Sequence, residues 1–253
     1  MSQARRPLIA GNWKMNGLAR SGAALAREIA HYAREESDSL PCELLVCPPA
    51  TLVREVAAAV FGSGVQVGGQ DCHAATQGPF TGDIAAAMLA DAGCTFVIVG
   101  HSERRATHNE TNQTVAAKAT AAQAAGLSAI ICVGENTAAR ERGSTLDVVA
   151  GQLINSLPEA PDPAKTVVAY EPVWAVGSGR TPTIDEIVEV HRHIRGLLAE
   201  RIPGAETIRI LYGGSVGPAN AGQILAADEV DGALVGGASL SPDEFWGVAQ
   251  SCR

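Results

Sequence analysis

Short apolar runs alternate with longer amphipathic or alanine-rich segments along nearly the whole chain. The runs are continuously apolar and do not alternate with polar residues, a pattern typical of parallel strands buried on both faces. The predicted strands are residues 7–13, 43–47, 65–69, 95–100, 128–133, 166–170, 208–212 and 232–235. The predicted helices are residues 21–34, 51–60, 84–92, 111–125, 138–156, 183–201, 218–226 and 242–250.

Two of the predicted helices begin with recognisable capping sequences. Thr183 is followed three residues later by Glu186, and Ser241 is followed by Pro242. The first pair is typical of a capping box, and the second places proline at the first helical position, where its missing N–H costs nothing. Both signals support the predicted strand-to-helix order.

A strand–helix unit that recurs about eight times over 253 residues predicts a closed eight-stranded parallel (β/α)8 barrel ringed by helices. The alternative is an open doubly wound sheet, which would carry a Gly-x-Gly-x-x-Gly turn after its first strand. The sequence there is Gly11-Asn-Trp-Lys-Met-Asn-Gly17, so the dinucleotide-binding alternative is disfavoured. No linker or change in composition divides the chain, and residues 1–253 are predicted to form a single α/β domain.

Composition narrows the class of protein without changing this fold. Hydrophobic residues make up 46% and charged residues 18% of the chain, as in a globular protein with a large core. A net charge of -8 argues against a nucleic-acid partner. The six cysteines form no Cys-x-x-Cys pair, which favours a reduced cytoplasmic protein. No apolar run approaches the roughly 20 residues of a membrane helix, and no signal peptide is expected.

Functional side chains of such a barrel come from the C-terminal ends of its strands. Glu171 directly follows the predicted strand 166–170, and Pro172 disfavours a helical conformation of Glu171. A Glu-Pro pair is usually a solvated turn. Here an apolar segment with two glycines follows it, Pro172 to Gly179, and this segment is expected to close as a lid. Closure would desolvate Glu171 and raise its pKa, which makes it a candidate general base.

His101 and Lys14 are candidate partners of this base. His101 follows Gly100 and precedes Ser102 and Glu103, which resemble the start of a helix. A neutral imidazole there could hydrogen-bond a substrate oxygen, although a histidine at a strand end is more often a packed or capping residue. Lys14 leaves the first strand at the same end of the barrel. A lysine is usually solvated, but in an acidic chain an inward ammonium suggests an anionic substrate.

Glycine-rich turns after the last two strands are candidates for phosphate binding. The turns are Gly213-Gly-Ser215 and Gly236-Gly237, at the place where barrel enzymes often hold a phosphate. Other chemistries fit less well. His191-x-His193 lies in a predicted helix and points to different faces, so no metal site is expected. The chain also lacks the Gly-x-Ser-x-Gly motif of a nucleophilic serine.

Several motifs together carry a family resemblance. The motifs are Asn12-x-Lys14, Gly100-His-Ser-Glu-Arg104, Cys132-Val-Gly-Glu135, Ala169-Tyr-Glu-Pro-Val-Trp174, Tyr212-Gly-Gly-Ser-Val216 and Gly236-Gly237. In this order they resemble the triosephosphate isomerase family, whose fold is the TIM barrel. The resemblance implies interconversion of dihydroxyacetone phosphate and D-glyceraldehyde 3-phosphate through an enediolate, as part of glycolysis and gluconeogenesis. No cofactor and no metal are implied.

The same resemblance implies roles for individual residues. Glu171 would be the proton-shuttling base, His101 the neutral electrophile, Lys14 the electrostatic partner of the anion and Asn12 its polarising neighbour. Glu103 would support Lys14 and His101. The residues implied in substrate binding are Asn12, Lys14, Gly177, Ser215, Gly236 and Gly237.

The resemblance also implies a homodimer in which Thr81 reaches the partner's site from the segment 70–82. That segment departs from the family pattern. Asp71 replaces Asn, Pro79 replaces Ala, and Asp83 replaces the longer Glu whose expected partner is Arg104 of the other subunit. These departures concern the strength of the dimer. In the lid, Val176, Ser178 and Arg180 replace Ile, Thr and Lys.

Two other classes of function remain. A non-catalytic phosphate-binding barrel could act as an interaction protein, but it would be free to lose Glu171, His101 or Lys14, and all three are present. A barrel enzyme acting on a different phosphorylated sugar is disfavoured by the lid sequence.

Overall fold

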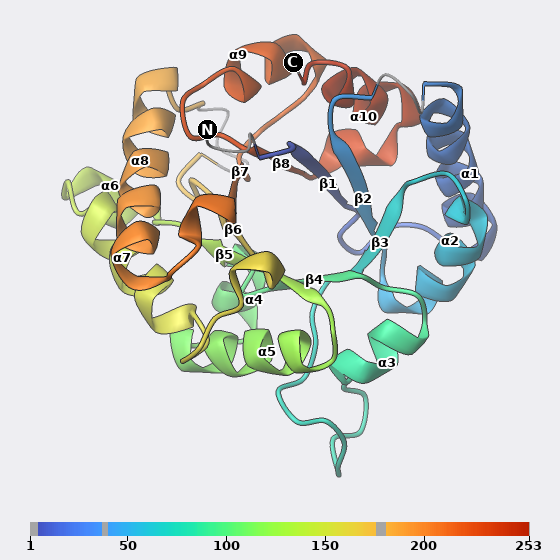
Figure 1. Ribbon diagram of the computed structural model, residues 1–253, viewed down its shortest axis with the longest axis horizontal. Helices are drawn as coiled ribbons and strands as arrows, with labels where there is room; N and C mark the ends of the chain where they lie inside the picture. The colour runs from blue at the N-terminus through green and yellow to red at the C-terminus, as the bar shows by residue number, and fades with distance from the viewer. Residues whose placement is uncertain (1–4, 37–39, 176–180, 253) are drawn as a thin grey trace.

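The computed structural model describes residues 5–36, 40–175 and 181–252. Eight parallel strands follow one another around a closed barrel in chain order, and β8 pairs with β1 to close it (Figure 1). The strands are β1 (Leu8–Asn12), β2 (Glu43–Cys47), β3 (Gln66–Gly69), β4 (Phe96–Val99), β5 (Ser128–Val133), β6 (Thr166–Tyr170), β7 (Arg209–Tyr212) and β8 (Gly232–Val235). The predicted fold class is therefore confirmed, and the open doubly wound sheet is excluded.

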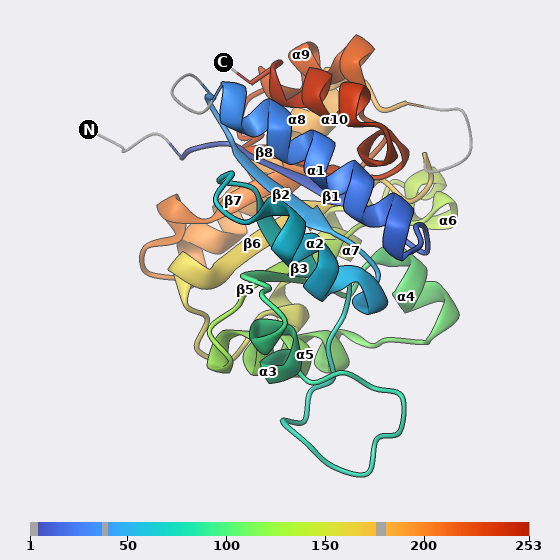
Figure 2. The same cartoon turned by 90° about the vertical axis from the view of Figure 1, so that its right-hand side faces the viewer.

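Helices surround the barrel on its outside (Figures 1 and 2). The α-helices are α1 (Ala19–Glu35), α2 (Val53–Val60), α3 (Ala86–Asp91), α4 (Ser102–Thr107), α5 (Asn112–Ala124), α6 (Thr137–Glu141), α7 (Thr145–Ser156), α8 (Ile184–Arg201), α9 (Pro218–Leu225) and α10 (Pro242–Ala249). The short 3-10 helices are η1 (Ala50–Leu52), η2 (Pro163–Lys165), η3 (Ala205–Thr207) and η4 (Gly237–Leu240).

Side chains of each strand alternate between two buried layers, which explains why the strands are apolar throughout. In β5, Ile130 and Cys132 belong to the core inside the barrel, whereas Ala129 and Ile131 belong to the core between strands and helices. This alternation follows from the two-residue period of a strand. The interior is filled with side chains, so the functional cavity lies at one end of the barrel and not along its axis.

Both predicted helix starts are present. The Thr183 hydroxyl accepts a hydrogen bond from the Glu186 N–H, and the Glu186 carboxylate accepts one from the Thr183 N–H at 2.7 Å. The Ser241 side chain caps α10 in the same way, with Pro242 at the first helical position. The capping signals were therefore sufficient to locate these two helix N-termini.

The segment 138–156, predicted as one helix, is two helices. α6 ends at Glu141 and α7 begins at Thr145. Gly143 has φ +68, and its N–H and that of Ser144 donate to the carbonyls of Arg140 and Ala139, a Schellman ending that turns the chain. A single helix over 138–156 is therefore wrong.

The segment between β3 and α3 projects away from the barrel (Figures 1 and 2). At its base, the Asp71 carboxylate contacts Lys118 Nζ at 2.7 Å and Arg104 at 2.8 Å. Glu110 contacts the same two cations, each at 2.6 Å. Burial raises the pKa of Asp71 despite the opposing effect of Lys118. Two carboxylates and two cations thus neutralise one another where the projection leaves the barrel.

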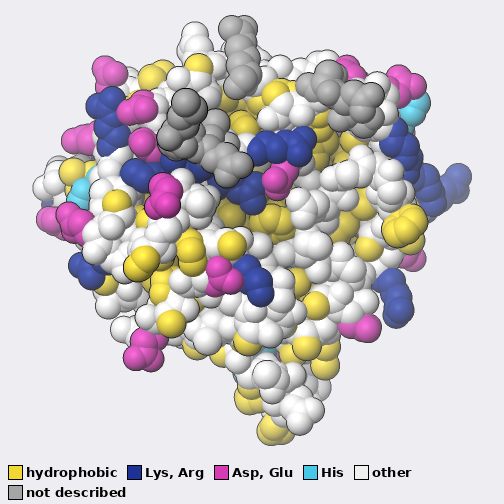
Figure 3. Space-filling model, in the orientation of Figure 1, with side chains coloured by type: hydrophobic (Ala, Val, Ile, Leu, Met, Phe, Trp, Pro, Cys, Tyr) yellow, Lys and Arg dark blue, Asp and Glu magenta, His cyan; other side chains and the backbone are white. Residues whose placement is uncertain are grey.

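The surface shows no large area of one charge on the face seen in Figure 3, where acidic and basic side chains lie side by side. The projecting segment stands out at the bottom of this view and carries apolar side chains, among them Phe80, which is 42% exposed. Within residues 5–36, 40–175 and 181–252, no helix is long and apolar enough to span a membrane.

Candidate active site

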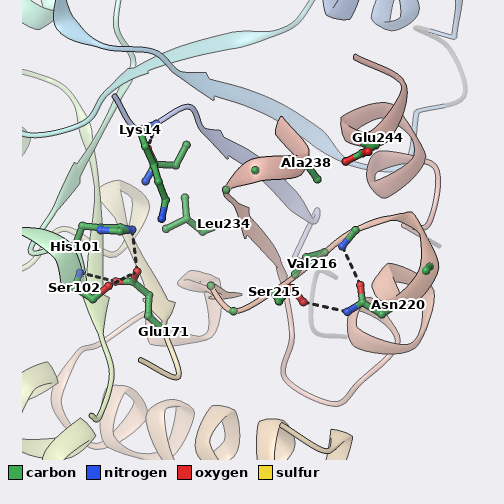
Figure 4. A pocket seen from close by; sticks show the side chains of 17 residues that line it. Lys14, His101, Ser102, Glu171, Ser215, Val216, Asn220, Leu234, Ala238 and Glu244 are labelled. Carbon is green, nitrogen blue, oxygen red and sulfur yellow. Dashed lines mark hydrogen bonds and ion pairs between the residues drawn. The ribbon is translucent and has the colours of Figure 1, made fainter. Parts of the chain in front are cut away.

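A cavity of about 550 Å³ opens at the C-terminal ends of the strands (Figure 4). It contains most of the residues expected to act on or bind a substrate, which come from β1, β4, β6, β7 and β8 and from the turns after them. The predicted residues that line it are Asn12, Lys14, His101, Glu171, Ser215, Gly236 and Gly237. The closed barrel is what brings together side chains that are far apart in the sequence.

Glu171 is the first residue after β6, and its side chain is nearly inaccessible to solvent, with the residue 3% exposed. The peptide N–H of Glu171 continues the sheet by donating to the Val133 carbonyl at 2.8 Å. Its carboxylate accepts hydrogen bonds from the Ser102 N–H and hydroxyl, both at 3.0 Å. His101 Nε2 lies 2.9 Å from the same carboxylate. Three donors therefore surround one buried anion.

These donors determine the acidity of Glu171. Burial by itself would raise the pKa of the carboxyl, because a low-dielectric site disfavours charge. The hydrogen bonds from His101 and Ser102 outweigh burial, and the pKa of Glu171 is lowered below its usual 4.5. In this arrangement Glu171 is an anion held by its neighbours.

His101 is positioned by a sharp backbone turn and by a helix start. Gly100 has φ +67, a left-handed conformation that favours glycine. His101 is the N-cap of α4, and its Nδ1 accepts the Glu103 N–H at 3.2 Å. An Nδ1 that accepts carries no proton, so the ring proton of the neutral imidazole is on Nε2, directed at Glu171. The capping hydrogen bond thus sets which nitrogen can donate into the cavity.

Lys14 follows β1 in a strained conformation, with φ +51. The Asn12 side chain accepts the Lys14 N–H at 3.0 Å, and Gln70 donates to the Lys14 carbonyl at 2.8 Å. The Lys14 ammonium lies 2.6 Å from the Glu103 carboxylate at the rim of the cavity. In Figure 4 the side chains of Lys14 and His101 lie on the side of the cavity opposite Ser215. The Asn12 side chain therefore holds the backbone of Lys14, and the Glu103 carboxylate holds its ammonium group.

Two glycine-containing turns form the remaining wall. The turn after β7 includes Gly213, Gly214 and Ser215, and the turn after β8 includes Gly236 and Gly237. A side chain on Gly213 would come within 3.0 Å of the Glu171 side chain, and one on Gly236 within 3.5 Å of Lys14 Cε. A side chain at Gly213 would thus crowd Glu171, whereas one at Gly236 would make only ordinary contact with Lys14. The bare backbone of both turns can approach an anionic group.

Three predicted site residues lie elsewhere. Gly177 is outside the described residues, as are Val176, Ser178 and Arg180 of the expected lid. Thr81 is exposed on the projecting segment and does not line the cavity of its own chain. Glu103 does not line the cavity, and it reaches the site through its contacts with Lys14 and His101. Arg104, expected to meet Asp83 of a second subunit, is paired with Asp71 and Glu110 of its own chain.

The described start of the expected lid packs on the barrel. Ala175 N–H donates to the Pro172 carbonyl at 2.9 Å, which makes a turn directly after Glu171. The Trp174 ring lies under the Arg140 guanidinium, 4.9 Å from centroid to Cζ. Glu135, the last residue of the motif Cys132-Val-Gly-Glu135, is buried and accepts a hydrogen bond from the Tyr170 hydroxyl at 3.2 Å. Glu135 therefore supports the strand that carries Glu171 and does not line the cavity.

Sequence reasoning missed several residues that line the cavity, among them Ser102 and Leu234. The sequence predicts Ser102 only as the start of a helix, yet this residue supplies two of the three donors to Glu171. Its position beside His101 is the signal that could have identified it. Leu234 of β8 lines the cavity floor and reads in the sequence as an ordinary core residue. Among the described residues, no cluster of His, Cys, Asp and Glu is arranged to hold a metal ion.

Comparison with known proteins gives consistent matches over nearly the whole chain. A family model described as Triosephosphate isomerase matches residues 7–252. A protein named triosephosphate isomerase from Afipia carboxidovorans is 55% identical over 248 residues, 98% of each chain. One of the same name from Ruegeria pomeroyi is 56% identical over 243 residues, 95% of each chain. The crystal structure of triosephosphate isomerase from Bartonella henselae matches with a TM-score of 0.89 at 43% identity, covering 97% of this chain and 98% of that one.

Proposed function

This chain belongs to the triosephosphate isomerase family, and we propose that it interconverts dihydroxyacetone phosphate and D-glyceraldehyde 3-phosphate through an enediolate. The observation that carries the proposal is the convergence on one cavity of a buried carboxylate, an imidazole N–H and an ammonium, opposite two glycine-rich turns. Family membership supplies the reaction and substrate class, and the geometry supports the division of roles among the residues.

In the proposed reaction Glu171 removes a proton from the carbon next to the substrate carbonyl. The electron pair of that C–H bond forms the C=C bond of an enediolate, and the carbonyl oxygen takes the negative charge. A proton then passes from the hydroxyl oxygen on the first carbon to the former carbonyl oxygen. Glu171 returns its proton to the former carbonyl carbon, and the first carbon becomes the new carbonyl. Nothing is oxidised or reduced overall. The carboxylate must first exchange its Ser102 donors for the substrate, and this loss of hydrogen bonds raises its pKa towards that of an effective base.

His101 and Lys14 act on the oxygen atoms in this proposal. Nε2 of His101 carries the proton, so it can donate to the carbonyl oxygen as negative charge develops there. The Lys14 ammonium, held by Glu103, contributes a positive charge to the same cavity. Ser215, Gly236 and Gly237 hold the phosphate. Gly177 belongs to this phosphate grip by family resemblance, with the segment 172–179 as the lid.

A coupled assay with glyceraldehyde 3-phosphate tests the function, and Glu171→Asp tests the base. The shorter side chain withdraws the carboxylate by about one methylene, and a misplacement of about 1 Å can cost about 100-fold in rate. We expect a loss of kcat of this order with an unchanged thermal unfolding midpoint. Full activity of Glu171→Asp would refute its role as base. An inactive wild-type protein that still binds phosphorylated sugars would favour the non-catalytic alternative.

We also propose a cytoplasmic homodimer in which Thr81 approaches the site of the partner subunit. Support comes from the segment between β3 and α3, which projects from the barrel (Figure 2). Phe80 on this segment is 42% exposed. A cavity of about 370 Å³ beside its base, lined by Gln70, Asp71 and Arg104, offers a concave surface next to the projection. The pairing of Arg104 within its own chain means that Asp83 is not needed to neutralise it.

A further inference from the structure

The side chain of Gln152 holds the backbone of Gly134 by two hydrogen bonds. Gln152 Oε1 accepts the Gly134 N–H at 2.7 Å, and Gln152 Nε2 donates to the Gly134 carbonyl at 3.0 Å. Gln152 lies in α7, and Gly134 is the first residue after β5. One carboxamide therefore satisfies both polar groups of one buried residue, as a neighbouring strand would.

The register of the sheet explains why a side chain is needed here. β4 pairs with β5 up to Val99, which lies opposite Ile131. Continued by three residues, this register would place Ser102 opposite Gly134, but the chain has already turned at Gly100 into α4. No strand therefore continues beside Gly134 on that side. The carboxamide of Gln152 takes the place of the missing strand.

Gly134 is in direct contact with the backbone of the proposed base. A Cβ added to Gly134 would lie 1.7 Å from the Glu171 carbonyl oxygen and 2.7 Å from its carbonyl carbon. The peptide after Glu171 therefore rests on Gly134 with no side chain between them. Gly134, Gln152 and Glu171 also border a second cavity, of about 340 Å³, so the packing around this contact is incomplete. The two hydrogen bonds of Gln152 fix Gly134 here, beside the sheet hydrogen bond from the Glu171 N–H to the Val133 carbonyl.

We propose that Gln152 is a positioning residue for the isomerase reaction, acting on Glu171 through the backbone of Gly134. It touches no substrate. It sets the position of the strand end against which Glu171 rests, and thereby the distance between the carboxylate and the substrate carbon. The inference rests on the proposed function, because positioning a base matters only if Glu171 is one.

The test is Gln152→Met, which keeps the length of the side chain and removes both hydrogen bonds. Lys14 and the glycine-rich turns, which are proposed to bind the substrate, follow β1, β7 and β8 and do not contact Gln152 or Gly134. Substrate binding should therefore be little affected. We expect kcat to fall about 10- to 100-fold, the range for a slightly misplaced catalytic group, while KM stays within about threefold. A loss confined to KM would contradict the inference.

Gln123→Met is the matched control. Gln123 of α5 makes the same kind of contact at the other end of β6, where its carboxamide bonds the Thr166 hydroxyl at 2.9 Å and the Asp162 N–H at 3.2 Å. We expect a comparable decrease of the thermal unfolding midpoint with unchanged kcat. If Gln123→Met loses as much kcat as Gln152→Met, the effect is general destabilisation and the inference fails.

Gln152→Glu gives a second, independent readout. An ionised carboxylate can accept from the Gly134 N–H but cannot donate to its carbonyl, whereas a protonated carboxyl can do both. The kcat of Gln152→Glu relative to wild type should therefore rise as the pH is lowered, while the ratio for Gln123→Met stays flat. A flat ratio for Gln152→Glu would overturn the proposal. If the wild-type protein shows no turnover, the proposed function fails with it. If wild type turns over and the Gln152 variants match it, only the positioning role fails.

Discussion

Glu171 combines nearly complete burial with three hydrogen-bond donors, and these two features act on its acidity in opposite directions. Burial favours the protonated form, and the donors favour the anion. The donors win in the described conformation, so the pKa of Glu171 is lowered. Ionised Glu171 accordingly contributes folding free energy above the unfolded-state pKa of about 4.5, and this contribution is lost as the pH falls through the lower folded-state pKa.

Ser102→Ala tests this balance through the pH dependence of catalysis. The Ser102 hydroxyl stabilises the anion of Glu171, whereas burial favours the protonated form. Without this hydroxyl the effect of burial is larger, and the pKa of Glu171 should rise. Since the ionised form is the proposed base, the acid limb of kcat/KM should move to higher pH. The measurement is the ratio of kcat/KM between variant and wild type across pH 4 to 8, in which titration of the substrate phosphate cancels.

Ser251→Ala, which removes a hydroxyl from the last turn after α10, serves as the control and should give a flat ratio. An acid limb that stays in place in Ser102→Ala would mean that the hydroxyl does not influence Glu171.

The sequence predicts those candidate site residues whose type indicates their chemistry, and it does not predict those whose role depends on geometry. Glu171, His101 and Lys14 are conspicuous at strand ends. Gln152 is not, because a glutamine inside a helix looks like any solvated position, and its partner Gly134 lies 18 residues away. Only the closed barrel shows that the two meet beside Glu171.

At the scale of elements, strands were predicted closely because their boundaries follow from continuous burial, whereas the extent and the breaks of some helices were not predicted. For α4 only the start, at Ser102, was predicted, because a helix of six residues is too short to show a helical repeat of apolar positions. The break between α6 and α7 depends on the conformation of Gly143, and a glycine within an amphipathic segment does not by itself predict a break. The pattern of hydrophobic residues therefore could not predict local backbone conformation.

Gly143→Ala measures the contribution of that break. No atom lies within 4 Å of the added methyl group, so the only cost is the left-handed backbone at φ +68. We expect a loss of about 1 kcal/mol of unfolding free energy, which corresponds to a decrease of about 2–4 °C in the unfolding midpoint.

Gly196→Ala provides the opposite case. Gly196 lies inside α8, its position is equally free of contacts, and its backbone is helical. Alanine there should raise stability by about 0.5–1 kcal/mol. Two changes of the same sign would show that backbone conformation does not explain the break between α6 and α7.

At the scale of the whole molecule, the candidate active site lies at one end of the barrel, and the segment between β3 and α3 projects from its side. In the proposed dimer, Thr81 on the projecting segment of one chain would complete the active site of the other. Dilution should therefore reduce specific activity at the same concentration at which sedimentation shows the mass falling to that of one chain. Specific activity that is constant across dissociation would show that each barrel works alone.

All six cysteines are reduced and buried, none more than 5% exposed. Burial raises the pKa of Cys72 and Cys94 to about 12, so little of the reactive thiolate forms in the folded state. Because all six thiols are buried, a thiol reagent can modify them only in molecules that have opened. Cys252, at the end of the chain, should be labelled first by fraying, and Cys132, inside the barrel below Glu171, only on global unfolding. The order of labelling would report how the barrel comes apart, with no probe added to the chain.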